Sequence, residues 1–355
     1  MFKQRIPLAL SYDDVLLVPQ FSDIGSRADV DLTTQISPHV KIRLPLISIN
    51  MTDVTGVEMS IAIAKLGGLG FLPRFIPIEK EADMVYQVKK ANLQVGAAVG
   101  IKNYEWERVE ALAKAGADII TVDVAHGQMQ KAIDFTRRIK QKFGNSIDII
   151  SGVVATYEGA CSLFKAGADS VRVGVGPGTI CVTRVVTGCG VPQITALLEA
   201  SRAARKFGRT ILCDGGTKNH GDIVKGLAAG ASAVIIGSQF AGCSETPGKL
   251  VIKKGLKYKT YNASTSFTEK NNHNKNLNGN SKSYVNHIEG VESIVPFKGP
   301  LENTVKRMDA NIRSGLSYCG AYNIPQLWKK AHFIQVTSMG VRESEPHGVI
   351  VRGRY

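Results

Sequence analysis

The sequence predicts an α/β fold of the (β/α)8 barrel class, and three observations support this prediction. Between residues 44 and 236, eight short runs rich in β-branched residues alternate with segments of helical periodicity. Only a crossover helix joins parallel neighbours, so the alternation indicates parallel pairing. Glycine also ends several helical segments just before the next strand, as a helix C-cap does (Gly116, Gly144, Gly167 and Gly230). A doubly wound open sheet shares this pattern and is the alternative.

The elements follow one another with short connections. After an entry segment at 11–34, the predicted strands are 44–49, 68–72, 93–99, 118–122, 147–153, 170–175, 210–213 and 233–236. The predicted helices are a helical pattern through 62–64, then 79–90, 105–115, 129–143, 158–166, 193–207 and 222–229. Two further helices, at 301–316 and 324–330, and a strand-like tail around 342–344 complete the pattern. We therefore expect residues 1–355 to form a single domain.

The regular pattern stops between residues 249 and 295, which we interpret as an insertion after the eighth strand. Its segment KNNHNKNLNGNSKS, residues 270–283, is rich in asparagine and poor in apolar residues. We expect this part to be disordered, because it cannot bury enough surface to order itself. The insertion is either a surface loop without a role or a mobile lid, since long loops inside compact domains are often lids.

The composition limits the classes of function. The chain carries 44 basic and 30 acidic residues, but the basic residues are scattered and no basic helix contains interleaved aromatic residues. We therefore expect no nucleic-acid partner and favour anionic small molecules. No apolar run reaches membrane-spanning length and the N-terminus lacks the features of a secretory signal, so we expect a soluble, cytoplasmic protein without a membrane partner. Six cysteines without metal-ligand spacing predict reduced thiols.

The stretch RVGVGPGTICVTRVVTGCGVPQ, residues 172–193, carries the most specific signal. It begins as a strand and then breaks into GVGPG at 174–178, which no strand or helix interior tolerates. Such a loop leaves backbone N–H groups uncovered, and these can hold a phosphate. Cys181 follows at once, and a cysteine beside an anion site is a candidate nucleophile. The alternative is that Cys181 is a small buried hydrophobic residue.

This loop resembles the signature GxGPG[ST]xCxT of the inosine-monophosphate dehydrogenase / guanosine-monophosphate reductase family. The likeness extends over nearly the whole chain, from SYDDVLLVPQ at Ser11 to RESEPHG at Arg342. It implies a barrel fold, a purine nucleoside monophosphate substrate and a nicotinamide cofactor. Only one helix is predicted between Pro73 and Leu93, so the chain resembles a form of the family without the regulatory CBS insertion. The insertion at 249–295 matches the family's mobile active-site flap.

The resemblance also implies roles for individual residues. Cys181 is the expected covalent catalyst at C2 of the purine, and Thr183 and Glu289 are the expected proton relay. The expected substrate-binding residues are Ser48, Thr179, Asp214, Gly215, Gly216, Gly237, Ser238 and Tyr261. The expected cofactor-binding residues are Asp123, Ala125 and Gly127, and the backbone carbonyls of Gly176, Gly178 and Cys181 are expected to hold a monovalent cation such as potassium. The family is usually tetrameric, so a homotetramer is expected.

Several of these residues have plainer interpretations from the pattern alone. A carboxylate at a strand end can bridge two ribose hydroxyls, but Asp214 could equally be a helix N-cap. Glu289 could be a solvated surface charge, which is the usual fate of Glu in a loop. His126, in the cofactor loop, is interpreted as positional rather than catalytic.

The family contains two activities, and the flap discriminates between them. A dehydrogenase must activate water, and the family does so with an Arg–Tyr dyad in the flap. The sequence has no Arg between Arg209 and Arg307, and the nearest pattern is Lys282-Ser283-Tyr284. We therefore predict an NADPH-dependent GMP reductase. The alternatives are an NAD-dependent IMP dehydrogenase, which the segments VGAAVG at Val95 and GVPQIT at Gly190 favour, and a nucleotide-binding protein without turnover.

Three departures from the family pattern motivate the last alternative. Val153 replaces a common Asn, the order Met51-Thr52-Asp53 inverts the usual Asp-Thr, and Arg172 replaces a usual Lys. Each change affects a strand end or the loop after one, where a barrel carries its chemistry.

Overall fold

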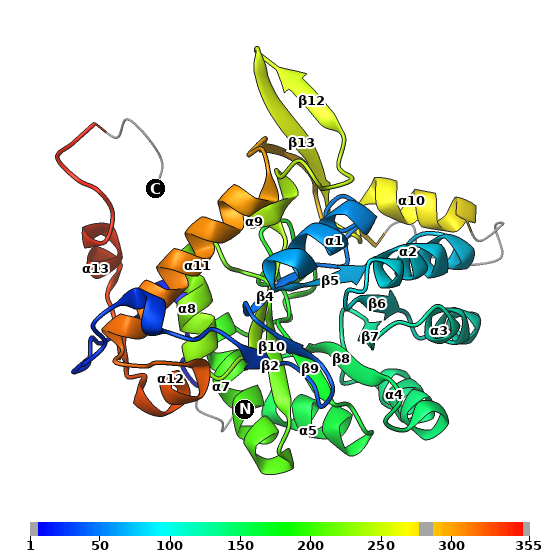
Figure 1. Ribbon diagram of the computed structural model, residues 1–355, viewed down its shortest axis with the longest axis horizontal. Coiled ribbons are helices and arrows are strands. Elements are labelled where there is room, and N and C mark those ends of the chain that lie inside the picture. Colours follow the sequence, from blue (N-terminus) through cyan, green and yellow to red (C-terminus); the bar gives the residue numbers. More distant parts are fainter. Residues whose placement is uncertain (1–5, 277–286, 351–355) are drawn as a thin grey trace.

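A closed barrel of eight parallel strands forms the centre of the molecule, which confirms the predicted fold and excludes the open sheet (Figure 1). The computed structural model describes residues 6–276 and 287–350. The barrel strands are β4 (Leu46–Ser48), β5 (Leu69–Leu72), β6 (Gly96–Val99), β7 (Ile119–Asp123), β8 (Asp148–Val154), β9 (Ser170–Val173), β10 (Thr210–Asp214) and β11 (Ala233–Ile236). The barrel closes where β11 pairs with β4.

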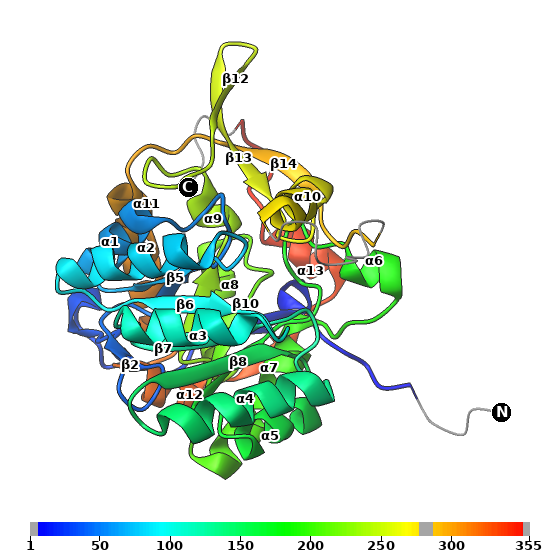
Figure 2. The same cartoon turned by 90° about the vertical axis from the view of Figure 1, so that its right-hand side faces the viewer.

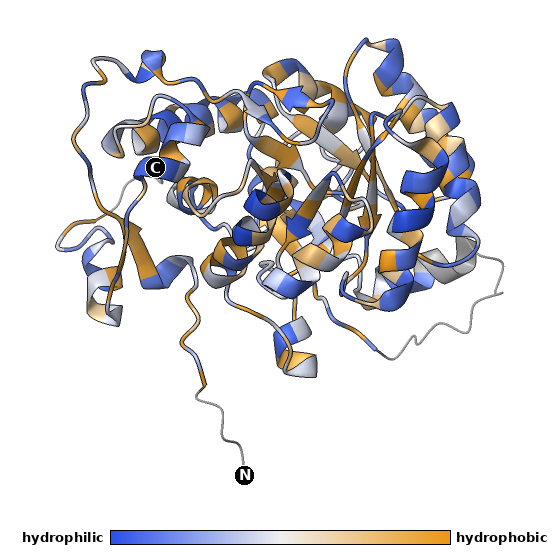
Figure 3. Ribbon diagram, turned by 90° about the horizontal axis from the view of Figure 1, so that it is seen from below, coloured by the Kyte–Doolittle hydropathy of each residue, from blue (hydrophilic) through white to orange (hydrophobic). Residues whose placement is uncertain are grey.

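Helices surround the barrel, and their inner faces cover its outward-pointing side chains. They are α1 (Val57–Leu66), α2 (Ile78–Lys90), α3 (Glu105–Lys114), α4 (Gln130–Phe143), α5 (Tyr157–Lys165), α7 (Gln193–Phe207), α8 (His220–Ala228) and α11 (Leu301–Tyr318). Seen from below, the strands are mostly hydrophobic and the helices carry hydrophilic outer faces (Figure 3). Helix α8 begins two residues before its predicted start, because Asn219 caps it by accepting a hydrogen bond from the Asp222 backbone N–H at 3.0 Å.

Apolar residues of an N-terminal hairpin close the lower end of the barrel, where the strands begin. The hairpin pairs β2 (Thr34–Gln35) with β3 (Lys41–Ile42). Its residues Ile36 and Val40 are buried in one cluster with barrel residues such as Phe71 and Leu212. The lower end is therefore a packed core rather than an opening.

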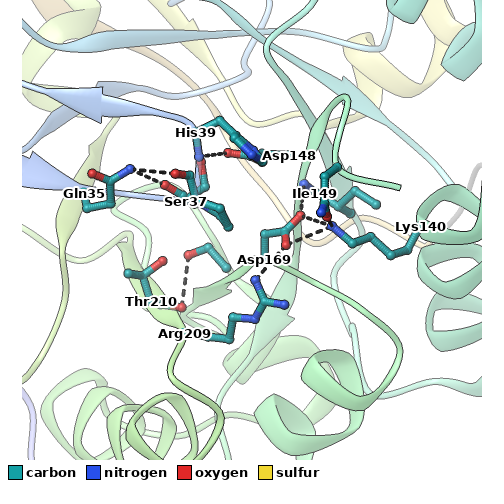
Figure 4. Close-up of polar contacts among 12 residues, drawn as sticks. Gln35, Ser37, His39, Lys140, Asp148, Ile149, Asp169, Arg209 and Thr210 are labelled. Carbon is teal, nitrogen blue, oxygen red and sulfur yellow. Dashed lines mark hydrogen bonds and ion pairs between the residues drawn. The ribbon is translucent and has the colours of Figure 1, made fainter. Parts of the chain in front are cut away.

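Buried acids hold this lower end together (Figure 4). The Asp148 carboxylate contacts both the backbone N–H and the ring Nδ1 of His39, at 2.8 and 2.7 Å. The Asp169 carboxylate accepts from Lys140 at 3.0 Å, from Arg209 at 2.8 Å and from the Ile149 backbone N–H at 3.0 Å. These acids join the starts of neighbouring strands to the hairpin and the helices.

The insertion contains more structure than its composition predicts. Strands β12 (Leu250–Lys253), β13 (Leu256–Asn262) and β14 (Glu292–Pro296) form an antiparallel sheet, and α10 (Phe267–Asn276) follows β13. The prediction of a disordered polar segment is therefore wrong for residues 270–276, which complete α10, whereas 277–286 lie outside the described residues. Figure 2 shows the β12–β13 hairpin projecting above the barrel, with α10 and β14 beside it. Hydrogen bonds within α10 and between the strands satisfy the backbone, so a polar composition does not prevent regular structure here.

The C-terminal part also differs from the prediction. After α11 and α12 (Ile324–Lys330), strand β15 (Phe333–Gln335) pairs with β1 (Val15–Leu17). Residues around 342–344, predicted to be strand-like, instead belong to the end of α13 (Ser338–Glu343), which begins where the Thr337 side chain accepts from the Gly340 N–H at 3.3 Å. None of the helices in the described part of the chain is long and apolar enough to cross a membrane.

Candidate active site

A pocket of about 200 Å³ opens at the upper end of the barrel, where the strands finish. Its wall combines the cysteine loop at 176–181, the segment 214–217 after β10, and residues 237–238 after β11. The insertion adds Tyr261, residues 263–265 and Glu289. The pocket thus brings together segments more than a hundred residues apart, as expected when parallel strands all end at one face.

The cysteine loop is fixed by close backbone contacts. A side chain at Gly174 would meet the Asp214 carbonyl oxygen at 1.9 Å, so only glycine fits this position. The Arg184 guanidinium donates to the carbonyls of Val175 at 3.1 Å and Val191 at 2.5 Å, which joins the two sides of the loop. The insertion closes over it, because the Val182 backbone N–H donates to the Glu289 carbonyl at 2.9 Å.

Cys181, Thr183 and Glu289 form a continuous polar chain in the pocket wall. The Cys181 sulfur lies 3.1 Å from the Thr183 hydroxyl, which donates to Glu289 Oε2 at 2.5 Å. Cys181 is a free, half-buried thiol, unlike Cys213, which is fully buried, so the interpretation of Cys181 as a core residue does not hold. Burial alone would raise the pKa of Glu289, but hydrogen bonds from Thr183 and His287 outweigh it and hold this pKa below its usual range. Glu289 is therefore a paired carboxylate, not a solvated surface charge.

A cluster of hydroxyl groups and glycines forms the opposite side of the pocket. The Thr179 and Ser238 hydroxyls lie 3.2 Å apart. The Tyr261 hydroxyl approaches Gly237 so closely that an added Cβ would lie 2.7 Å from it. Gly215 and Gly216 both have left-handed backbone, with φ of +88° and +87°. Hydroxyl and backbone N–H donors gathered after the seventh and eighth strands suit a phosphate group.

Asp214 lies between these two sides, at the end of β10. It is buried, and its Oδ2 accepts from Arg172 Nη2 at 2.8 Å and Nε at 2.9 Å. Burial raises the pKa of Asp214, and the Arg172 guanidinium opposes that shift. The alternative role of Asp214 as a helix N-cap is wrong, because α8 begins at His220 and Asn219 caps it.

Ser48 is the one predicted substrate-binding residue that the structure separates from the pocket. It is fully buried, and its hydroxyl lies 2.5 Å from that of Thr55. Successive side chains of a strand point to opposite sides, and the next residue, Ile49, lines the pocket instead. The prediction of direct substrate contact by Ser48 is therefore corrected to a structural position one residue before the pocket wall.

The expected cofactor residues lie beside the pocket rather than in its wall. The Asp123 carboxylate is held by Arg172 at 3.1 Å and lies 3.5 Å from Arg74. The Gly127 backbone N–H donates to the Val153 carbonyl at 2.7 Å, and Val153 lines the pocket. Ala125 is exposed, and binding of a cofactor by the loop after β7 stays a prediction.

The expected cation ligands are backbone carbonyls of the cysteine loop. Gly176 and Gly178 line the pocket, and the Gly178 carbonyl already accepts from the Cys181 backbone N–H at 3.0 Å. No group of His, Cys, Asp or Glu side chains suited to a metal ion occurs among residues 6–276 and 287–350. Binding of a monovalent cation by these carbonyls stays a prediction.

His287 was not predicted to take part in this site. His287 Nε2 lies 2.5 Å from Glu289 Oε1, on the side of the carboxylate opposite Thr183. The two residues lie two positions apart in a segment without regular secondary structure, so no periodicity in the sequence predicted their contact.

The fold and this pocket define a (β/α)8 barrel with a thiol in its upper loops, facing a cluster of donors suited to a phosphate group. The chain belongs to the family described as the IMP dehydrogenase / GMP reductase domain, whose model matches residues 9–347. Members of this family are oxidoreductases.

Relatives with both names cover nearly the whole chain. It is 36% identical to inosine-5'-monophosphate dehydrogenase of Cryptosporidium parvum, over 98% of this chain and 97% of the relative. It is 30% identical to GMP reductase of Leishmania donovani, over 97% of this chain and 98% of the relative. A crystal structure of a cysteine-to-alanine variant of Trypanosoma brucei GMP reductase, in complex with guanosine 5'-monophosphate, superposes with a TM-score of 0.92 at 29% identity, covering 97% of this chain and 99% of that one.

Proposed function

We propose that this protein is an NADPH-dependent GMP reductase that converts GMP to IMP and ammonia through a covalent adduct at Cys181. The observation that carries the proposal is the chain of contacts from Cys181 through Thr183 to Glu289 in the pocket wall. A thiol attacking C2 of the purine needs a group that takes its proton, and the departing amine needs a group that returns one. One relay beside the thiol can do both.

The residues divide the work as follows. The Thr179, Ser238 and Tyr261 hydroxyls and the glycines beside them bind the phosphate, and Asp214 binds the ribose hydroxyls. The Cys181 sulfur bonds to C2, and the C2–N bond breaks as the relay protonates the amine, which leaves as ammonia. Asp123, Ala125 and Gly127 would hold NADPH, which would supply the hydride for C2. The C2–S bond then breaks and Cys181 returns as a thiolate, which releases IMP.

One observation favours reduction over oxidation of IMP. The sequence has no Arg between Arg209 and Arg307, so the Arg expected of a water-activating dyad is absent from the flap. The described part of the flap presents Glu289 to Thr183, and this relay is sufficient for reduction. Lys282, Ser283 and Tyr284, the nearest match to that dyad, lie outside the described residues.

IMP dehydrogenase activity with NAD is the second candidate, and several relatives favour it. Those from Cryptosporidium parvum, Nitrosopumilus maritimus and Bacillus subtilis carry that name, at 36%, 33% and 32% identity. Chain length does not decide between the activities. The alignments with Leishmania donovani GMP reductase and the Nitrosopumilus maritimus dehydrogenase run over 483 and 472 positions, so both relatives have residues that this chain of 355 lacks.

Nicotinamide absorbance separates the two activities directly. The protein is mixed with GMP plus NADPH and, separately, with IMP plus NAD, each with and without potassium. We expect oxidation of NADPH with release of one ammonia per GMP. Turnover confined to IMP plus NAD, with xanthosine monophosphate as product, would establish the second candidate instead. The assay also tests the expected potassium requirement, and light scattering of the same sample tests the expected homotetramer.

A further inference from the structure

His287 extends the polar chain of the pocket by one residue, toward solvent. Glu289 uses one carboxylate oxygen for the Thr183 hydroxyl and the other for His287 Nε2, each at 2.5 Å. An ionised carboxylate only accepts hydrogen bonds, so His287 donates through Nε2. The chain thus runs from the Cys181 sulfur through a hydroxyl and a carboxylate to an imidazole.

The exposure of these side chains increases along the chain. The Glu289 side chain is 13% exposed, whereas that of His287 is 46% exposed. A proton held at Glu289 is therefore shielded from water, and one held on the imidazole can exchange with it. Histidine is also the side chain that ordinarily gains and loses a proton near neutral pH.

The charged groups around His287 favour transfer through Glu289. On its own segment, His287 faces the Glu289 carboxylate. From α10, the Lys270 ammonium donates to the His287 backbone carbonyl and interacts with Glu289. Below the carboxylate, Thr183 and the Cys181 thiol complete the surroundings. The hydrogen bonds from Thr183 and His287 and the nearby Lys270 ammonium lower the pKa of Glu289, so this carboxylate is held as a proton acceptor between the hydroxyl and the imidazole.

We propose that His287 is the residue through which the Cys181–Thr183–Glu289 relay exchanges protons with solvent. This inference rests on the proposed reduction of GMP. When Cys181 attacks as the thiolate that the previous turnover regenerated, it has no proton to give, so the proton for the amine comes from solvent. Imidazolium at His287 gives its proton to Glu289, Glu289 passes one to Thr183, and Thr183 protonates the amine as the C2–N bond breaks. Neutral His287 then regains a proton from water. His287 acts through Glu289 and is not among the residues that line the pocket, so it is a positioning residue for proton transfer.

Replacing His287 with Gln tests this role, because the amide keeps an N–H donor for Glu289 but cannot carry a proton. For GMP plus NADPH we expect kcat to fall about 10- to 100-fold, with KM for GMP within about twofold of the wild type. The matched control is His332→Gln, since His332 is an exposed histidine remote from the pocket wall, and it should leave both constants unchanged.

Two further measurements exclude a merely structural role. The wild-type kcat should fall as pH rises through the range where histidine loses its proton, and His287→Gln should flatten that limb. Mixing IMP with NADP runs only the hydride-transfer step, in reverse, and this step needs no proton from the relay. The single-turnover burst of NADPH in this experiment should therefore be the same in wild type and His287→Gln. Added imidazole should restore deamination to His287→Ala.

The outcomes separate the inference from the proposed function. Wild-type activity on GMP with an unchanged kcat in His287→Gln overturns the role of His287 alone. Equal loss in both half-reactions, without imidazole rescue, also overturns it, because that result indicates a folding defect. If the wild type acts only on IMP plus NAD, the proposed function fails. In that case the same variants test whether His287 serves hydrolysis of the covalent adduct. A slower rate confined to hydrolysis supports the relay, and an unchanged rate of hydrolysis overturns it.

Discussion

The two ends of the barrel contain the same kind of acidic residue in contrasting surroundings. At the lower end, Asp148 and Asp169 are buried and accept hydrogen bonds from backbone N–H groups and from fixed basic side chains. At the upper end, Asp214 and Glu289 line a pocket and take partners that belong to the site itself. An acid whose partners are all structural stabilises the fold, whereas an acid facing a pocket is available for chemistry. Changes at the upper end should therefore affect catalysis, and changes at the lower end should affect stability.

Replacing Cys181 with Ala should have the largest effect of any change at the upper end. Without the sulfur no bond to C2 forms, so we expect the turnover of GMP to fall at least about 10³-fold, or ~4 kcal/mol in activation free energy. The affinity for GMP should stay within a few-fold, because the phosphate side of the pocket is intact. Steady-state kinetics and calorimetric titration measure the two effects. Intact-protein mass spectrometry should show the GMP-derived adduct only in the wild type. Substantial residual turnover by Cys181→Ala would show that Cys181 is not the nucleophile.

Replacing Asp169 with Asn should show the opposite pattern at the lower end. The change leaves Lys140 and Arg209 without their shared carboxylate, so we expect a loss of about 2–4 kcal/mol in the free energy of unfolding. Turnover per folded molecule should be unchanged. Urea denaturation, combined with kcat below the transition, measures both. Glu199→Gln, which breaks an exposed pair with Arg202, is the control and should cost less than about 0.5 kcal/mol. A reduced kcat of the folded Asp169→Asn protein would show that the lower end also affects catalysis, which would contradict the division between the two ends.

The periodicity of the sequence was sufficient to predict the barrel. Residues 193–207 form α7 as predicted, because an amphipathic pattern and the following Gly208 define a helix locally. The pairing of β13 with β14 was missed because these strands meet across a gap of about thirty residues, and composition carries no information on such pairing. The β12–β13 hairpin turns through Lys254 and Gly255, so a local turn signal was present there and was not used.

The prediction of the site succeeded where a motif is local and failed where register matters. Cys181 and Thr183 lie two residues apart in one signature, and only the resemblance linked them to the distant Glu289. Ser48 was predicted to contact the substrate, but the next residue, Ile49, lines the pocket instead. A short buried run does not reveal which of its side chains face inward. Arg172 was noted only as a departure, and its contacts with both Asp123 and Asp214 require the closed barrel.

Replacing Arg172 with Lys tests a residue that is buried like the lower acids but lies at the upper end. A single ammonium cannot reproduce the guanidinium contacts with Asp123 and Asp214. We expect KM for GMP to rise about tenfold, or ~1.4 kcal/mol, with a smaller change in kcat. Burial raises the pKa of Asp214 and Arg172 opposes the rise, so in the variant this pKa should be higher. In the proposed role of Asp214, ribose binding needs the carboxylate and is lost as pH falls through that pKa. The acidic limb of kcat/KM should therefore move to higher pH, and an unmoved limb would contradict this account.

Replacing Ser48 with Ala should have the smallest effect, although the residue lies next to the upper pocket. The change removes one buried hydroxyl, while Thr55 keeps its hydrogen bond to the Ile49 carbonyl, so we expect a loss of about 1 kcal/mol in stability. KM for GMP should not change. Ser238→Ala is the matched control, since the same atoms are removed from the pocket wall, and there KM should rise several-fold. If Ser48→Ala raised KM as much as Ser238→Ala, we would conclude that Ser48 contacts the substrate directly. Burial would then fail to distinguish structural from functional residues at this end of the barrel.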